Sequence, residues 1–90
     1  MPYTPLLPPP FLRSIKKVEP ELKKAIDRAI KTILKDPKKG EYKHGDLAGK
    51  IVHRFKKAGT TYLIAYEISG KVVKLKLFGP HENFYKILKR

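Results

Sequence analysis

Residues 20–36, PELKKAIDRAIKTILKD, decide how the rest of the chain folds. Pro20 suits the first turn of a helix, and Asp36-Pro37 ends it, because proline disfavours the helical conformation of the residue before it. Between these ends, apolar side chains recur at alternating intervals of three and four residues, which is the spacing of one buried helical stripe. The stripe consists of Leu22, Ala25, Ile26, Ala29, Ile30, Ile33 and Leu34.

The segment before this helix predicts a helical hairpin. Phe11, Leu12, Ile15 and Val18 have the spacing of one helical face, so we expect a shorter helix and a very short turn before Pro20. Residues 1–10 contain five prolines, which lack the N–H group that the interior of a sheet requires. We therefore expect an extended N-terminal segment at the edge of a sheet.

After the helix, the hydrophobic period changes to two. Residues 38–49 are polar and contain three glycines, which predicts a loop. Residues 51–56, 61–68 and 72–78 predict three strands joined by tight turns, and the second is apolar on both faces, as a central strand would be. Residues 82–90 predict a short last helix. We therefore expect one α+β domain over residues 1–90, with the helical hairpin packed on one face of a small antiparallel meander.

Side-chain alternation predicts what the other face of the sheet carries. If Phe55, Leu75 and Leu77 point into the helices, the opposite face is uncovered and crowded with cations. Like charges on neighbouring strands repel each other, and an anionic ligand would relieve that repulsion. By the same alternation Glu67 points to the open face, whereas His53 points inward. The four cations expected on the open face are Arg54, Lys56, Lys74 and Lys76.

The composition narrows the function. The 90 residues contain 21 Lys and Arg against 8 Asp and Glu, a net charge of +13, which favours a polyanionic partner such as RNA, DNA, a membrane surface or an acidic protein. Without cysteine there is no disulfide framework and no thiolate zinc site, and the three histidines form no ligand pair, so we expect no metal and no small-molecule cofactor. No apolar run could cross a bilayer, and no signal segment is recognisable, so we expect a soluble, cytoplasmic protein without a membrane partner.

Four stretches resemble the RelE/ParE superfamily, the toxins of bacterial and archaeal toxin–antitoxin pairs. They are FLRSIKKVEPELKKAIDRAIKTILKDPKKGE (11–41), GDLAGKIVHRF (45–55), YLIAYEI (62–68) and GPHENFYKILKR (79–90). The resemblance implies a small sheet packed on a helical hairpin and an acidic antitoxin partner. RelE-type members are endoribonucleases that cut messenger RNA on the ribosome, whereas ParE-type members inhibit DNA gyrase and lack the nuclease residues.

The resemblance also implies a catalytic set on the open face. Arg54 has the position of a basic residue in the first meander strand, and Lys57 lies near the following hairpin, where another basic residue is common. His81 and Tyr85 have the spacing of four seen in some nuclease members. Leu63, however, stands where a functional arginine is common, which favours the ParE-type alternative. The side chains expected to hold the RNA backbone are Lys50, Lys56, Lys74 and Lys76.

RNA cleavage without a metal needs a base for the ribose 2′-hydroxyl, a cation at the phosphate and an acid for the leaving oxygen. His81 suits either proton transfer, because a histidine ordinarily has a pKa of about 6.5. Arg54 would clamp the phosphate with its planar guanidinium, and Tyr85 would stack on a base. His44 and Glu67 are alternative bases. The functions that remain open are a messenger RNA endoribonuclease, a non-enzymatic gyrase inhibitor and an RNA-binding module without catalysis.

Overall fold

The structure is a computed structural model that describes residues 3–89. Met1 and Pro2 of the expected edge segment and Arg90 of the expected last helix lie outside the described residues. The elements, in chain order, are β1 (Thr4–Leu6), α1 (Pro9–Ile15), α2 (Pro20–Lys35), a 3-10 turn η1 (Pro37–Lys39), β2 (Glu41–Tyr42), a second 3-10 turn η2 (Gly45–Leu47), β3 (Ile51–Lys57), β4 (Thr60–Ser69), β5 (Val72–Pro80) and α3 (Phe84–Leu88).

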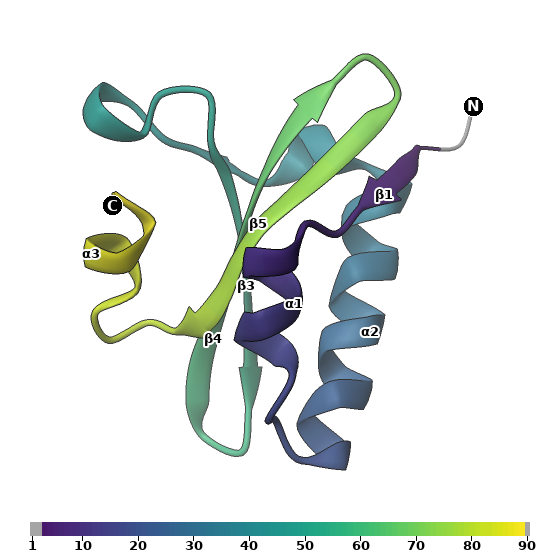
Figure 1. The fold of residues 1–90 in the computed structure, drawn as a ribbon, viewed down its shortest axis with the longest axis vertical. Coiled ribbons are helices and arrows are strands. Elements are labelled where there is room, and N and C mark those ends of the chain that lie inside the picture. Colours follow the sequence, from purple (N-terminus) through teal and green to yellow (C-terminus); the bar gives the residue numbers. More distant parts are fainter. Residues whose placement is uncertain (1–2, 90) are drawn as a thin grey trace.

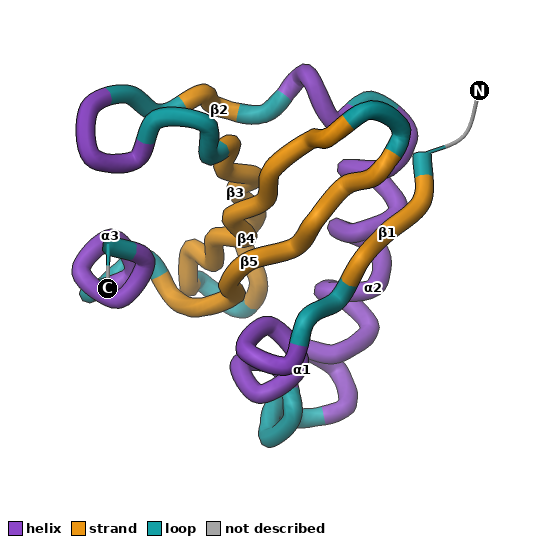
Figure 2. The backbone as a smooth tube through the Cα atoms, turned by 45° about the horizontal axis from the view of Figure 1, so that its top comes forward, coloured by secondary structure: helices purple, strands orange, loops and turns teal. Residues whose placement is uncertain are grey.

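The predicted α+β fold class is confirmed: α1 and α2 pack on one face of the sheet, and α3 lies on the other (Figures 1 and 2). The helix α2 begins at Pro20 and ends at Lys35, as predicted. The helix α1 ends at Ile15 and buries Phe11 and Ile15. Leu12 was expected on the same buried face, but its side chain is 46% exposed, so that expectation was wrong.

The sheet is wider than the predicted meander of β3, β4 and β5. Its strand order is β1-β5-β4-β3-β2, and β1 runs parallel to β5 while the other pairs are antiparallel. Pro5 is tolerated in β1 because an edge strand does not need every N–H group for the ladder. Residues 38–49 were expected to form a loop only, but Glu41 and Tyr42 pair with Val52 and Ile51 as strand β2.

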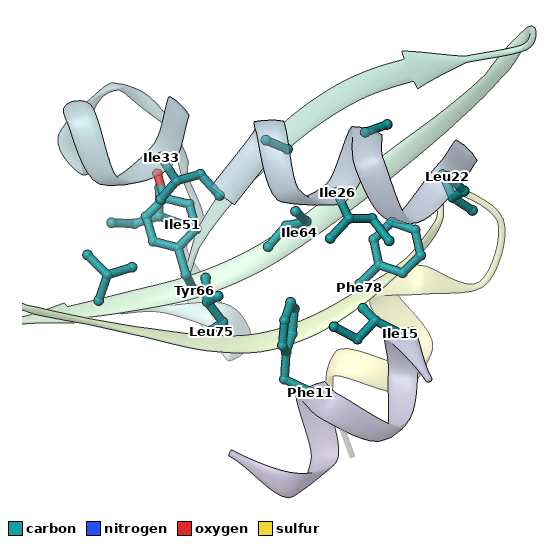
Figure 3. Packing of buried hydrophobic residues seen from close by; sticks show 13 residues of the cluster. Phe11, Ile15, Leu22, Ile26, Ile33, Ile51, Ile64, Tyr66, Leu75 and Phe78 are labelled. Atoms are coloured by element: carbon teal, nitrogen blue, oxygen red, sulfur yellow. The ribbon is translucent and has the colours of Figure 1, made fainter. Parts of the chain in front are cut away.

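The main core lies between the sheet and the helices α1 and α2 (Figure 3). Tyr66 of β4 joins this core with 1% of its surface exposed, and its hydroxyl donates a hydrogen bond to the carbonyl oxygen of Pro37 at 2.6 Å. This bond ties the central strand to the end of α2. Other side chains in this core are Phe11, Ile15, Ile26, Ile33, Ile51, Ile64, Val73, Leu75 and Phe78.

A second apolar cluster covers the face that was expected to be bare. Phe84 and Leu88 of α3 are buried against the sheet, and Leu47 of the η2 turn joins them. The sheet contributes Val52, Leu63 and Ala65, each at most 2% exposed. The expectation of an uncovered face was therefore wrong, because the apolar side chains at the centre of that face are themselves buried by α3 and η2. We call this group of buried residues the α3 cluster: Leu47, Val52, Leu63, Ala65, Phe84 and Leu88.

A β-bulge between β4 and β5 changes the side-chain alternation. The register passes from the pair Ala65 and Leu77 to the pair Tyr66 and Leu75, so Lys76 is the extra residue on β5. Leu77 consequently packs against the α3 cluster. The expectation that it would point into the helices with Leu75 was wrong, since one inserted residue shifts the alternation beyond it.

Tyr66 should make the stability of the protein depend on pH above pH 9. Burial raises the pKa of the Tyr66 hydroxyl to about 12, whereas a tyrosine in an unfolded chain has a pKa of about 10. The folded state holds this proton more tightly, so the free energy of unfolding should fall as the pH rises from about 10 to about 12.

Urea unfolding of wild type and Tyr66→Phe across this pH range measures the effect. We expect the free energy of unfolding of the variant to be about 1–2 kcal/mol lower than that of wild type near neutral pH, because the hydrogen bond to Pro37 is lost. This difference in unfolding free energy should narrow above pH 10. A difference in unfolding free energy that stays constant up to pH 12 would contradict the raised pKa of Tyr66.

Candidate functional site

Several polar side chains meet on the α3 side of the sheet, at the end where the β3–β4 hairpin turns. Lys56 and Thr61 are paired across β3 and β4, and the amide of His81 donates a hydrogen bond to the carbonyl oxygen of Thr61 at 3.0 Å. Lys56, Thr61 and His81 therefore form one row across the sheet. Arg54 lies two residues from Lys56 on β3 and, by alternation, on the same face.

Glu41 of β2 lies between two cations at the border of this row. Its Oε1 atom accepts a hydrogen bond from Arg54 Nη2 at 3.1 Å, and its Oε2 atom accepts one from Lys43 Nζ at 2.6 Å. Lys43 holds the pKa of Glu41 below its usual value, and Glu41 in turn raises the pKa of Lys43. The Lys43 side chain is only 19% exposed, whereas Glu41 and Arg54 are about half exposed.

Lys43 connects this ion-pair network to α3. Its Nζ atom lies 4.8 Å from the centre of the Tyr85 ring, and the His81 ring meets the Tyr85 ring edge-on with 6.2 Å between centres. The Tyr85 hydroxyl oxygen is buried and has no hydrogen-bond partner among residues 3–89. We call this continuous group the Arg54–His81 site: Glu41, Lys43, Arg54, Lys56, His81 and Tyr85.

The backbone around α3 explains why His81 and Tyr85 reach the sheet. The carbonyl oxygen of His81 accepts a hydrogen bond from the amide of Phe84 at 3.2 Å, and Asn83 adopts a left-handed conformation with φ of 62°. This turn reverses the chain after β5. Phe84 is 2% exposed and anchors the helix in the α3 cluster, so Tyr85 on the next position reaches Lys43, the residue after β2.

The structure separates the other expected site residues from this group. Lys57 lies on the opposite face from Arg54, because alternation along β3 places it on the side of Phe55, which packs in the main core. Lys50, Lys74 and Lys76 line a cavity at the other end of the α3 face. Leu63, the position of the expected family arginine, is completely buried in the α3 cluster.

The alternative proton acceptors are also placed elsewhere. Glu67 accepts a hydrogen bond from Lys50 at 3.2 Å and is the strand partner of Lys74, not of a residue in the Arg54–His81 site. His44 is exposed at the start of the η2 turn. His53 lies on the α2 side, where its ring stacks on Phe55 at 6.3 Å and burial lowers its pKa. The predicted inward direction of His53 is confirmed.

Glu41 and Lys43 belong to the site but were not predicted from the sequence. Both lie in the stretch that was expected to be a loop, where charged side chains are usually solvated. The alternation of Glu41, Tyr42 and Lys43 was the available signal, since residues two apart on a strand share one face. A strand of two residues is too short for that pattern to be recognised with no knowledge of its partner strand.

In residues 3–89, no group of histidine, aspartate and glutamate side chains could hold a metal ion. None of the helices in this part of the chain is long and apolar enough to cross a membrane.

Comparisons with known proteins agree with the fold. A family model described as the ParE-like toxin of type II bacterial toxin–antitoxin systems matches residues 6–89. The toxin–antitoxin complex RelBE2 from Mycobacterium tuberculosis contains a similar chain, with a TM-score of 0.76 and 20% identity over 90% of this chain and 100% of that one. A mutant of the E. coli toxin RelE in the free state gives a TM-score of 0.78 and 14% identity over 99% of this chain and 94% of that one.

A comparison with curated protein sequences gives no match. The two structural likenesses, at 20% and 14% identity, establish the fold alone. The family model covers residues 6–89, almost the whole chain, and therefore decides the family. The chain belongs to the ParE-like toxins of type II bacterial toxin–antitoxin systems, within the RelE/ParE superfamily.

Proposed function

We propose that this toxin is a metal-independent endoribonuclease that cleaves messenger RNA on the ribosome, in the cytoplasm. One observation carries the proposal: β2, β3 and the C-terminal segment bring Lys43, Arg54, His81 and Tyr85 into one contiguous group. The group combines phosphate-binding cations, a titratable imidazole and an aromatic ring. Cleavage through the ribose 2′-hydroxyl requires the cations and the proton-transferring imidazole, and the aromatic ring would stack on a base.

The cations account for phosphate binding. The two carboxylate oxygens of Glu41 lie 3.1 Å from Arg54 and 2.6 Å from Lys43. A phosphodiester also presents two charged oxygens, and an entering RNA strand would displace Glu41 and take over both contacts. Arg54 would then stabilise the charge that develops on the phosphate, since its guanidinium matches paired oxygens. Lys56, two residues from Arg54, would hold the adjoining backbone.

His81 would transfer the proton. In the forward step the 2′-oxygen forms a bond to phosphorus and loses its proton to a base, while the bond from phosphorus to the 5′-oxygen breaks and that oxygen takes up a proton. The products are a 2′,3′-cyclic phosphate and a free 5′-hydroxyl. His81 suits one of these two transfers, and the Tyr85 ring lies beside it.

Glu41 is a poor choice for the base. Lys43 lowers its pKa, and a carboxylate with a lowered pKa has little driving force to accept a proton at neutral pH. We propose that Glu41 instead holds Arg54 and Lys43 in place while the site is empty. It would compete with RNA for both cations.

We also propose that an acidic antitoxin binds this toxin. One of the solved structures with this fold is a toxin–antitoxin complex, and the net charge of +13 favours an acidic partner.

Gyrase inhibition is the rival function. Leu63 is completely buried at the position where a functional arginine is common in nuclease members, so this toxin has no guanidinium there. That observation favours a ParE-type activity.

The nuclease proposal predicts that Arg54→Ala and His81→Ala abolish RNA cleavage. Mapped RNA ends in a translating extract should show cyclic phosphates with wild type, and each variant should lower the cleavage rate at least about 100-fold. Lys31→Ala, an exposed lysine on α2, is the matched control and should cleave like wild type.

If wild type leaves messenger RNA uncut and inhibits supercoiling by DNA gyrase, the nuclease proposal is wrong and the function is the ParE-type activity. Salt-sensitive RNA binding without any cleavage or gyrase inhibition would leave a plain RNA-binding module.

Glu41→Gln should tighten RNA binding. Removal of the carboxylate frees Arg54 and Lys43, and the exposed ion pairs that RNA must break cost about 0.2–1 kcal/mol each. We expect about two- to fivefold tighter binding of an uncleavable 2′-O-methyl RNA, measured by fluorescence anisotropy. Unchanged binding combined with loss of cleavage would instead identify Glu41 as the base.

The antitoxin proposal predicts that a small acidic protein from the adjacent reading frame co-purifies with the toxin. Because the pairing is electrostatic, its association rate should fall as salt rises, which stopped-flow mixing can measure. If the adjacent frame encodes no small acidic protein and none co-purifies, the pairing is wrong.

A further inference from the structure

A second group of cations lies on the α3 face, at the opposite end from the Arg54–His81 site. Four lysines line a cavity of about 460 Å³ between β5, the η2 turn, α3 and residues 8–10: Lys50, Lys74, Lys76 and Lys89. Leu77 and Ile87 form part of an apolar wall. We call this cavity the lysine pocket. Its volume lies in the usual range of small-ligand sites, about 300–1,000 Å³.

The charges of the lysine pocket are only partly balanced. Lys50 pairs with Glu67 at 3.2 Å, and Lys89 lies 3.8 Å from Asp46. Within residues 3–89, Lys74 and Lys76 have no carboxylate within ion-pair distance. Both side chains are half-buried, so their charges are less screened than those on an open surface. An anion between them would be stabilised.

The β-bulge builds this arrangement. In a regular strand Lys76 and Leu77 would point to opposite faces. The extra residue in β5 lets both line the same pocket, a cation beside an apolar side chain. Bulges are enriched next to functional sites because they re-aim side chains in this way.

The lysine pocket and the Arg54–His81 site share a face but are separate. The buried side chains of the α3 cluster, including Val52 and Ala65, lie between them. Lys74 lies in β5 and His81 directly follows the last residue of β5, seven positions after Lys74. At about 3.3 Å per residue they lie about 20 Å apart, a distance that a single RNA strand of a few nucleotides can span.

We infer that the lysine pocket is a second subsite for the same RNA strand. It binds a single nucleotide that lies a few positions from the scissile bond. Lys74 and Lys76 bind its phosphate, and Leu77 and Ile87 contact its base. Ile87 is 50% exposed at the pocket wall, which an apolar contact with a base would explain. This inference rests on the proposed function and deepens it, because substrates must then be long enough to reach both sites.

The phosphate contacts are tested with an uncleavable 2′-O-methyl RNA of about 12 nucleotides, a length within the site sizes of single-strand-binding domains. Affinity is measured by fluorescence anisotropy at several salt concentrations. Lys74→Gln/Lys76→Gln should bind about tenfold more weakly and lower the salt slope by about 0.7, because one phosphate is no longer neutralised. The control Lys31→Gln/Lys35→Gln removes the same charge from exposed positions on α2 and should retain the slope.

The base contact is tested with Ile87→Ser. This variant should bind the RNA about threefold more weakly, but an RNA that lacks bases should bind both proteins equally. Leu12→Ser on α1 is the matched control, since Leu12 is 46% exposed and Ile87 50%. Leu12→Ser should bind both RNAs like wild type.

Equal salt slopes for the two lysine double variants would overturn the inference, since the loss would then reflect net charge alone. It would also be overturned if poly-glutamate needs Lys74 and Lys76 while RNA does not, because the pocket would then bind an acidic protein. Binding that needs these lysines, without cleavage under any condition, would support the pocket and overturn the nuclease. Cleavage with an unchanged slope would overturn the pocket alone.

Discussion

The docking of α3 on the sheet is the contact on which the candidate site depends. Phe84 and Leu88 are buried against Val52, Leu63 and Ala65, and this apolar contact holds the C-terminal segment over the face opposite α1 and α2. His81 and Tyr85 lie on either side of Phe84 in the sequence, so the packing of Phe84 holds both of them near Arg54. The same cluster divides the cations of this face into two groups, so the apolar packing both assembles the Arg54–His81 site and separates it from the lysine pocket.

The two groups of cations differ in whether a carboxylate is already paired with them. At the Arg54–His81 site, Glu41 already occupies the position of an anion, and the proposed RNA substrate would have to displace it. In the lysine pocket, Lys74 and Lys76 have no acidic partner in the described part of the chain, so an anion would bind there without displacing one. A polyanion would therefore meet the lysine pocket first and reach the reactive site by exchange. An acidic antitoxin would compete for the same cations, which is a direct way to silence the toxin.

Regular periodicity made the predicted elements reliable, and irregular geometry caused the errors. The stripe of α2 and the alternation of β3 and β4 predicted their extents and the shared face of Arg54 and Lys56. Leu77 was misplaced because a bulge is invisible to a rule of strict alternation. Lys57 was grouped with Arg54 by its position near the hairpin, although alternation puts the two on opposite faces. Glu41 and Lys43 were missed because β2 exists only through its pairing with β3.

The sequence by itself determined the amphipathic helix, the central strand and the excess of positive charge, because these depend on local spacing and composition. Its resemblance to known toxins pointed to the family. Only the tertiary structure decided that the second sheet face is covered, that Glu41 pairs with both Arg54 and Lys43, and that Lys76 and Leu77 line one pocket. Each of these depends on contacts between segments far apart in the chain. Residue spacing does not show which side chains from distant segments come into contact. The packing of the whole chain decides these contacts.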